Sequence, residues 1–440
     1  MTNKLLILRT KLFLSSILAA SICFPLLAEE PAKAVNTKEN FTIIGDNFST
    51  ECGRGTCFSY SSNKKTYVVW PGPGMSPQIR AIDETTGEIS PIVRIRELNY
   101  SAKSDYHDYP SMVAGKDGTL HVFMTKHVRQ LHYFRSAPGG DIGAPWTETI
   151  FPDPAGYPYS LVASDGTLFI FYNWNMDPKY VHPERPLYFR RSDDGGKTWS
   201  KPVKCMDRDI DDMKELYVGA IKLEPAQGKY PERVNIVLTL AGRGGHNQCH
   251  KDIYYAYMDV NTQTMYDVSG ADLGDCISGA DEWNKIKVLD TGDSYKTPYA
   301  VHHTHNVTAD AATGNPLVGY EQYKDDPRKY YPTVQYWNGE KWNQPVFTPK
   351  GLMFCDMFRD PRGMFCYVRE AGTVTGYVYS AESNSFTEAG TFKIDGLSIA
   401  SFRLTGGYSG YEPARFVFHE KCENIKEVVP KFRVGIYNGK

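Results

Sequence analysis

An internal repeat of 48 residues constrains the fold of this chain more than any other feature of its sequence. Segment 109–123 returns as segment 157–171, with the letters YP, DGTL and F in the same places. In each copy an apolar run reaches an Asp-Gly pair, which favours a tight hairpin turn with positive φ, and a second apolar run follows. An aromatic run, at 131–136 or 187–192, and a segment with a Trp complete the copy. We therefore expect a four-stranded antiparallel unit.

Looser copies of this unit continue along the chain. One precedes residue 95, and others follow at about 216–290, 305–347, 351–390 and 396–439. Four-stranded units spaced by about 45–75 residues are typical of β-propeller blades. The fold predicted for residues 41–440 is therefore all-β, a seven-bladed β-propeller with four-stranded antiparallel blades. A pair of β-sandwiches is the alternative, and the close copy within the chain argues against it.

The composition agrees with a β fold. Aromatic residues make up 13% of the chain, with 30 Tyr, and there are 38 Gly and 27 Pro. This mixture favours many short strands joined by tight turns. The 49 Lys+Arg and 51 Asp+Glu nearly cancel, which excludes the basic surface of a nucleic-acid-binding protein. We expect a monomer without a nucleic-acid partner.

The first 28 residues predict export. Lys4, Arg9 and Lys11 precede an apolar run that ends at Ala28, the pattern of a cleaved signal peptide. A membrane-spanning helix is the alternative, but the run is short and no other segment could cross a bilayer. We expect a signal peptide at 1–28, a linker at 29–40, and a catalytic domain at 41–440 of a periplasmic or extracellular protein.

Residues 192–199, SDDGGKTW, fit the pattern S-x-D-x-G-x-T-W of an Asp-box. In this turn the Asp side chain, here Asp194, binds backbone amides, and the Trp, here Trp199, packs beneath the turn. The motif supports the propeller prediction and carries no chemistry of its own.

Two histidines are placed to reach one face of the predicted propeller. His107 lies where the innermost strand of a blade begins, and His127 lies in the loop after the second strand of the same blade. A histidine can act as a base near neutral pH. Either residue alone could equally be structural. His121 and His132 fall within strands, where we expect them to serve packing.

The next blade supplies a tyrosine and an arginine. Tyr172 lies near the end of its second strand, and strand alternation places Tyr188 and Arg190 on one side of its third strand. Arg243 lies in a glycine-rich segment and Trp174 in an aromatic one. Arginine offers a planar fork to a carboxylate, and aromatic rings can stack on sugars. Together these residues suggest a site for an anionic sugar, although each alone could be structural.

A cluster of His and Cys residues could bind a structural Zn²⁺ or Ca²⁺ ion. The candidate ligands are His246, Cys249, His250 and His303. Their spacing matches no established zinc pattern, and a cysteine of an exported protein can instead form a disulfide. We expect the chemistry itself to require no cofactor.

Several motifs occur together between residues 100 and 350: HDYPSM, DGTLHVFMTKH, LHYFRS, FYNW, LYFRRS and HKDIYYAYMD. In this combination the chain resembles the BNR-repeat seven-bladed propeller polysaccharide lyases, which include ulvan lyases and L-rhamnose-α-1,4-D-glucuronate lyases. The resemblance implies three catalytic residues and two that bind substrate, namely His107, His127, Tyr172, Arg190 and Arg243. The family spacing for the first arginine lands on Tyr188, two residues before Arg190.

The resemblance also implies β-elimination at a 4-O-linked uronic acid of an acidic polysaccharide, ulvan or the side chains of arabinogalactan. The bond cleaved is the rhamnose-α-1,4-glucuronate linkage, and the product is a 4,5-unsaturated uronate. An Arg that pairs with the carboxylate stabilises the charge that develops when the C5 proton leaves. A His or Tyr takes this proton, and a second group protonates the leaving oxygen. His107 and Tyr172 are both candidates for the base, with His127 assisting.

Three other functions use a similar scaffold. A related propeller α-L-rhamnosidase hydrolyses the same bond with a single His near its N-terminus, and residues 1–106 contain no His. A sialidase, suggested by the Asp-box, needs an Arg triad and an F/Y-R-I-P segment, for which FRDPRG at 358–363 is a poor substitute. The third is glycan binding without catalysis.

Overall fold

The computed structural model describes most of the predicted catalytic domain. The described residues are 41–48, 57–98, 109–125, 129–175, 184–208, 213–242, 245–292, 301–323, 329–370, 372–393, 399–407, 415–420 and 432–438. The predicted signal peptide and linker lie outside them, as do His107, His127 and Arg243. No helix in this part of the chain is long and apolar enough to cross a membrane.

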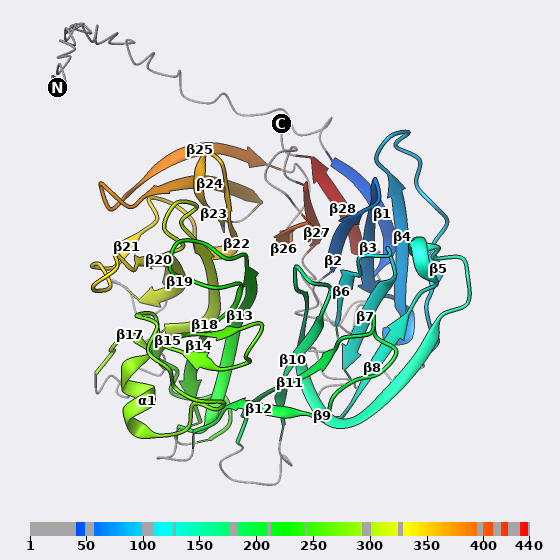
Figure 1. Cartoon of the computed structure of the whole chain (residues 1–440). Helices are drawn as coiled ribbons and strands as arrows, with labels where there is room; N and C mark the ends of the chain where they lie inside the picture. The colour runs from blue at the N-terminus through cyan, green and yellow to red at the C-terminus, as the bar shows by residue number, and fades with distance from the viewer. Residues whose placement is uncertain are drawn as a thin grey trace, which may run out of the picture. The chain divides into compact units, whose positions relative to one another are not determined.

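The described residues form six sheets of antiparallel strands (Figure 1). The first two in chain order contain β2 (Phe58–Ser62), β3 (Lys65–Pro71), β4 (Pro77–Asp83) and β5 (Val93–Arg94), and then β6 (Pro110–Ala114), β7 (Leu120–Thr125), β8 (Arg129–Arg135), β9 (Thr147–Val162), β10 (Leu168–Trp174), β11 (Leu187–Ser192) and β12 (Val203–Met206). The third contains β13 (Glu215–Glu224), β14 (Arg233–Ala241), β15 (Lys251–Asp259), β16 (Met265–Tyr266) and β17 (Lys287–Leu289).

The remaining three sheets complete the order. They contain β18 (Val301–Ala309), β19 (Pro316–Tyr323), β20 (Tyr330–Tyr336) and β21 (Val346–Phe347); β22 (Met353–Asp360), β23 (Gly363–Glu370), β24 (Thr373–Ser380) and β25 (Ser385–Lys393); and β26 (Ile399–Leu404), β27 (Arg415–Glu420), β28 (Phe432–Asn438) and β1 (Phe41–Phe48). Helices are short: η2 (Pro73–Met75), η3 (Pro138–Gly140) and α1 (Ala280–Lys285). The predicted all-β fold is confirmed.

Strand β9 belongs to two units at once. Its first part, from Thr147 to Ala155, pairs with β8, and its second part, from Ala155 to Val162, pairs with β10. The seven-stranded sheet is therefore β6–β9 followed by β9–β12, and these two units are the two copies of the close sequence repeat.

Successive units contact one another through their first strands. Strand β2 contacts β6, β6 contacts β9, β9 contacts β13, β13 contacts β18, β18 contacts β22, and β22 contacts β26. Strand β27, in the last sheet, contacts β2. The last sheet also pairs β1 with β28, so the first and last described strands lie side by side.

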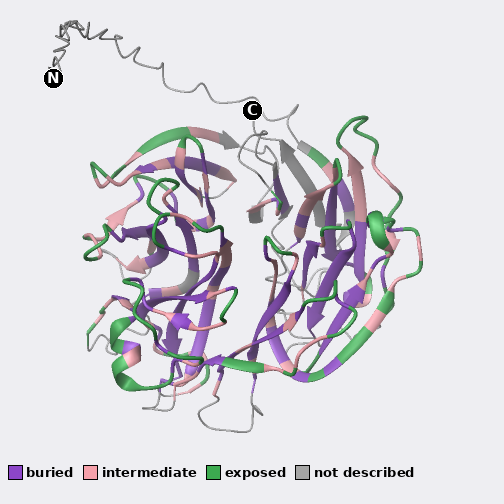
Figure 2. Ribbon diagram, viewed as in Figure 1, coloured by how far each residue is buried: buried purple, intermediate pink, exposed green. Residues whose placement is uncertain are grey.

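Apolar side chains fill the interfaces between neighbouring sheets, where most strand residues are buried (Figure 2). Phe171 of β10 packs in one cluster with Leu238 of β14, in the following sheet. Ile170 and Tyr172, on the opposite face of β10, pack in another cluster with Phe123 of β7. Because successive side chains of a strand point to opposite faces, each such strand contributes to two interfaces. This explains why these strands read as nearly continuous apolar runs.

The Asp-Gly turns of the repeat differ in part from the prediction. Gly118 and Gly166 have φ values of 80° and 99°, the predicted positive φ, which glycine adopts without a steric clash. Asp117 does not share the positive φ; its carboxylate instead accepts a hydrogen bond from Thr119 N at 2.9 Å. The Gly118 amide donates to the Gly115 carbonyl at 2.9 Å, so the turn spans four residues.

The Asp-box has the predicted structural role. Asp194 accepts hydrogen bonds from the amides of Lys197 at 3.0 Å and Thr198 at 2.9 Å. These bonds lower the pKa of Asp194 to about 2. Trp199 packs edge-on against Phe123 and Tyr133, with ring centroids 5.5 and 5.2 Å apart. The motif therefore ties the turn to the interface between the two repeat units.

Candidate functional site

The two histidines predicted to be catalytic lie just beyond the described strands. The segment that contains His107 precedes β6, and the segment that contains His127 follows β7. Pro110 of β6 pairs with Met124 of β7, so both segments join the same end of this hairpin. That His107 and His127 approach one face, and that they are catalytic, stay predictions, because both lie outside the described residues.

Tyr172 lies inside the protein. Its side chain is fully buried, and its hydroxyl donates a hydrogen bond to Asp153 Oδ2 at 2.5 Å. Burial, and then the Asp153 carboxylate, raise the pKa of this phenol well above its usual value. A phenol without solvent access, bonded to a buried carboxylate, does not suit the predicted exchange of a proton with a polysaccharide. The structure places Tyr172 in the interface between two units.

Arg190 is held in the same buried network. Its Nε and Nη2 donate to the two oxygens of Asp153 at 2.7 and 2.8 Å, and its Nη1 donates to the Ser200 carbonyl at 2.5 Å. The guanidinium also lies over the Phe151 ring, 4.7 Å from its centroid. The fork predicted to bind a substrate carboxylate is therefore occupied by a carboxylate of the protein itself.

The other residues predicted on this blade lie close by. Tyr188 and Arg190 do share one side of β11, as predicted: Tyr188 packs on Trp174, with centroids 4.8 Å apart. Arg191 points to the other side and pairs with Asp193 at 2.6 Å. Trp174 and Tyr188 are only partly buried.

A different arginine, Arg185, lies at the centre of a polar cluster that the sequence did not reveal. Arg185 and Glu215 form a parallel bridge between the segment before β11 and the start of β13. The guanidinium is buried among the rings of Tyr217 and Tyr157, with centroids 5.2 and 6.0 Å away. Its Nη1 is buried without a hydrogen bond among the described residues. A buried donor of this kind normally has a partner, so an unpaired Nη1 is unusual.

The neighbours of Arg185 keep it charged. Burial alone would lower the pKa of this guanidinium, but Tyr217, Tyr157 and Glu215 together raise it. Tyr157 takes a positive φ of 55°, next to an irregularity in the pairing of β9 with β10. Such a conformation is rare for a bulky residue and is often found at functional sites.

His246 lies in front of Arg185 and is oriented by Glu215. The imidazole Nδ1 is 2.6 Å from Glu215 Oε1, and the His246 side chain is 53% exposed whereas Glu215 is fully buried. The Asn247 amide donates to the other oxygen of Glu215 at 2.7 Å. His246 Nε2 lies 3.3 Å from Arg185 Nη2. Because arginine can only donate, Nε2 must accept, and the ring proton is therefore on Nδ1.

The four predicted metal ligands are not brought together in the described part of the chain. His246 binds Glu215, and His250 Nε2 lies 2.8 Å from Asn247 Oδ1. Cys249 packs against a hydrophobic cluster, and the side chain of His303 is outside the described residues. The described residues contain no group of three His, Cys, Asp or Glu side chains that could hold a metal ion. The metal stays a prediction.

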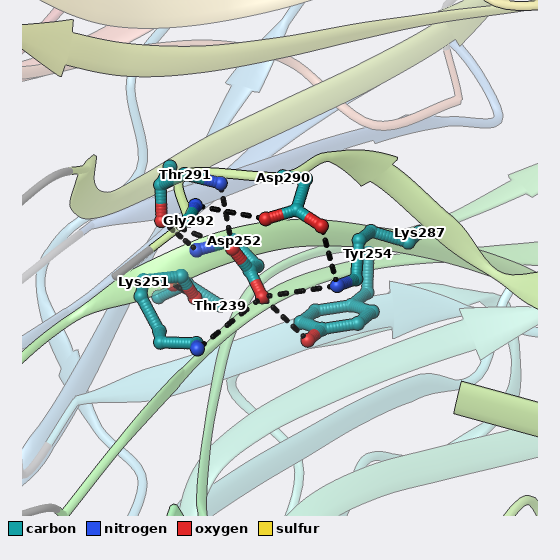
Figure 3. A network of polar contacts seen from close by, with 8 residues as sticks. All are labelled: Thr239, Lys251, Asp252, Tyr254, Lys287, Asp290, Thr291 and Gly292. Carbon is teal, nitrogen blue, oxygen red and sulfur yellow. Dashed lines mark hydrogen bonds and ion pairs between the residues drawn. The ribbon is translucent and has the colours of Figure 1, made fainter. Parts of the chain in front are cut away.

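A second polar network is centred on Asp252 (Figure 3), just after the loop that carries His246 and His250 in the sequence. Asp252 is buried at the start of β15, with a φ of 55°. Its carboxylate accepts from Thr291 N at 2.8 Å and Tyr254 Oη at 3.0 Å, and Lys287 lies 3.5 Å away. The network joins the end of the loop to the segment after β17, so it fixes the position of both.

The fold and its repeated unit define a propeller-type repeat protein. The chain belongs to the BNR repeat-containing family, whose sequence profile matches residues 86–348. Its fold is similar to that of an ulvan lyase of polysaccharide lyase family 25 solved with bound -[GlcA(1-4)Rha3S]-. The TM-score is 0.62 at 16% identity, over 91% of this chain and 94% of that chain.

A second solved structure has a similar fold. The polysaccharide lyase Uly1 matches with a TM-score of 0.60 and 12% identity, over 87% of this chain and 89% of that chain. A search of curated protein sequences finds no match. The resemblance seen in the sequence motifs is thus confirmed for the family and the fold.

Proposed function

We propose that this chain is a polysaccharide lyase that cleaves a uronic-acid-containing glycan by β-elimination. The observation that carries this proposal is the cluster around Arg185, where a buried guanidinium with an unused donor among the described residues lies beside an exposed imidazole. The bond we assign is the rhamnose-α-1,4-glucuronate linkage, which gives a 4,5-unsaturated uronate. The similarity in fold to ulvan lyases adds support.

In this proposal Arg185 binds the uronate carboxylate. The C5 proton of a uronate is weakly acidic because its removal places charge on the adjacent carboxylate. A guanidinium in a site of low polarity stabilises that charge more strongly than water does. Tyr157 and Tyr217 confine the guanidinium, so little reorganisation is needed as the charge develops.

His246 is our candidate for the base. Its Nε2 carries the electron pair, which accepts from Arg185 Nη2 at 3.3 Å and must leave this contact to take the proton. Glu215 stabilises the imidazolium that forms. His107 and His127 are our candidates for the acid that protonates O4. The segments that contain them join β6 and β7, in the unit before the one that carries Arg185. Tyr172 and Arg190 hold the units together and are not part of this mechanism.

Two further parts of the proposal concern the whole chain. We infer that the units close into a seven-bladed ring, supported by the contacts between successive first strands and by the pairing of β1 with β28. We also infer export, supported by the basic and apolar pattern of residues 1–28.

Absorbance near 235 nm, roughly the band of an unsaturated uronate, tests the reaction on ulvan or on rhamnose-capped arabinogalactan. We expect Arg185→Lys to lower kcat/KM by about 10²–10³-fold, because lysine keeps the charge and loses the fork. The matched control is Arg191→Lys, since Arg191 pairs only with exposed Asp193 among the described contacts. Circular dichroism verifies that both variants fold.

Each alternative outcome has a distinct meaning. Release of rhamnose without the chromophore would identify a hydrolase, and binding without either product would identify a glycan-binding protein. A normal rate for Arg185→Lys, with the chromophore present, would keep the lyase and reject this assignment of the site.

A further inference from the structure

The side chain of Asn173, near the end of β10, joins two of the segments that form the cluster around Arg185. Asn173 is buried, and its Nδ2 donates to two main-chain oxygens, the Arg185 carbonyl and the Leu216 carbonyl, each at 3.1 Å. The amide nitrogen carries two hydrogens, so one side chain serves both carbonyls. Leu216 belongs to β13, and the amide therefore links the sheet of β10 to the sheet of β13.

Leu216 lies between the two residues of β13 that contact the charged groups of the cluster. Glu215 Oε1 is 2.6 Å from His246 Nδ1, and the ring centroid of Tyr217 is 5.2 Å from the Arg185 guanidinium. Both residues share the main chain with Leu216. A bond that fixes the Leu216 carbonyl therefore also fixes the backbone from which these two side chains extend.

The main-chain contact between the two segments is short. Arg185 and Glu215 form an isolated parallel bridge, in which the Arg185 amide donates to the Lys214 carbonyl at 3.2 Å. A bridge of one residue pair restrains a segment less than a ladder of several pairs does. The two bonds from Asn173 add a second restraint, on the carbonyl side of Arg185.

The backbone of Asn173 is paired with the strand that supplies the other ring beside Arg185. Asn173 pairs with Gly156 of β9 and with Leu187 of β11. Gly156 precedes Tyr157, whose ring centroid lies 6.0 Å from the guanidinium. The strand pairs and the side-chain bonds of this one residue therefore reach the segments that carry Tyr157, Arg185 and the start of β13.

We propose that Asn173 is a positioning residue, which holds the Arg185 guanidinium at the His246 imidazole. This inference rests on the proposed function, because it assigns Asn173 to the same site, where it acts through Arg185 and does not touch the substrate. The counterpart of Asn173 in the other copy of the repeat, 48 residues earlier, is Thr125, which is also buried. The strand itself therefore does not require an amide at this place.

The first variant is Asn173→Thr, because the other copy of the repeat accommodates a threonine here. A hydroxyl has one hydrogen and cannot donate to two carbonyls at once. We expect kcat/KM on ulvan, per folded molecule, to fall by about 10–10²-fold and mostly in kcat, since a displacement of about 1 Å can cost about 10²-fold. Asn173→Asp, which keeps the size of the side chain, is the second variant and should act in the same direction.

A double-mutant cycle with Arg185→Lys separates positioning from a general loss of structure. If Asn173 acts through Arg185, Asn173→Thr should change kcat/KM by only about twofold in the Arg185→Lys background. The matched control is Gln335→Ala, which removes another buried amide, whose Nε2 donates to the Asn343 carbonyl at 2.9 Å in the fourth sheet. It should leave kcat/KM unchanged. An equal loss from Asn173→Thr in both backgrounds would overturn the proposal.

The reactivity of His246 tests the same geometry without catalysis. Diethyl pyrocarbonate acylates an unprotonated imidazole nitrogen, and His246 Nε2 in the wild type accepts from Arg185 Nη2 at 3.3 Å. Asn173→Thr should speed this acylation by about fivefold, since a hydrogen bond of ordinary strength slows a reaction that must break it by about this factor. Arg185→Lys should also speed it, and Gln335→Ala should not. Peptide mass spectrometry measures the rate at His246.

The two readouts distinguish this inference from the proposed function. If no unsaturated product ever appears but the Asn173 variants speed the acylation of His246, the lyase proposal fails and the positioning role stands. If the product appears and the acylation rate of both variants equals that of the wild type, the positioning role fails and the lyase stands.

Discussion

The buried hydrogen bond from Tyr172 to Asp153 allows a test of whether Tyr172 is structural or catalytic. A structural role predicts a loss of stability in Tyr172→Phe, and a catalytic role predicts a loss of activity. The substitution Tyr172→Phe removes the hydroxyl and leaves the ring in its cluster. A hydrogen bond to a charged group contributes about 1.5–3 kcal/mol to the free energy of unfolding. Asp153 keeps its two bonds from Arg190, at 2.7 and 2.8 Å, so the carboxylate is not left without donors. We therefore expect the lower part of this range, about 1.5–2 kcal/mol.

The assay measures stability and activity on the same samples. Over roughly 400 residues, the expected loss lowers the midpoint of thermal unfolding by about 2 °C. The rate at 235 nm, per folded molecule, should stay within about twofold of the wild type, because Tyr172 does not reach the substrate in our proposal. Tyr255→Phe is the control: its buried hydroxyl donates to neutral Asn235 at 2.8 Å, and its loss should cost about 1 kcal/mol. Abolished activity at unchanged stability would refute the structural role of Tyr172.

Two further predictions concern stability. His121 is buried against Tyr133, and burial lowers its pKa to about 4. Because the unfolded state binds the proton first, the His121 contribution is complete above pH 6.5 and falls by about 3 kcal/mol toward pH 4. Urea titrations of His121→Asn should show a flatter slope in that window, and an unchanged slope would contradict the assignment. Asp356 of β22 accepts from Lys222 Nζ of β13 at 2.6 Å and from the Leu404 amide of β26 at 2.8 Å, so it links the first strands of three units. Asp356→Ala should lower the free energy of unfolding by about 2–4 kcal/mol in the same titration. The comparison is Asp310→Ala, about 1 kcal/mol, since the side chain of partly buried Asp310 accepts, among the described contacts, only from amides and a hydroxyl of its own turn.

The sequence repeat predicts the sheets well because each hairpin depends on residues that are close together in the sequence. A glycine with positive φ and a run of apolar residues are needed at the same place in both copies, so Gly118 and Gly166 align, as do their strands. The side-chain contacts between one unit and the next do not recur along the chain. Asp153 lies where β9 passes from one unit into the other, and a sequence reading sees only FPDPAG. Its bonds to Tyr172 and Arg190 become visible only after the strands are paired.

The cluster around Arg185 was missed for a related reason. Its members come from the segment before β11, the start of β13 and the β14–β15 loop, and no short motif contains them. One signal was available: Arg185 precedes LYFRRS by two residues, as Arg129 precedes LHYFRS. The arginine thus occurs at the same place in both copies, at the start of a third strand. Comparing the copies position by position would have drawn attention to it before any resemblance was considered.

The same comparison bears on Tyr172. Its counterpart 48 residues earlier is Met124, an apolar residue that is fully buried in an interface between sheets. Strand alternation gives both residues the same orientation relative to their sheets, so Met124 predicts an inward side chain for Tyr172. A phenol at such a position needs a buried acceptor, and Asp153 supplies it. The spacing from His107 and His127 to Tyr172 identifies a position in the repeat, but the repeat itself shows that this position faces the core.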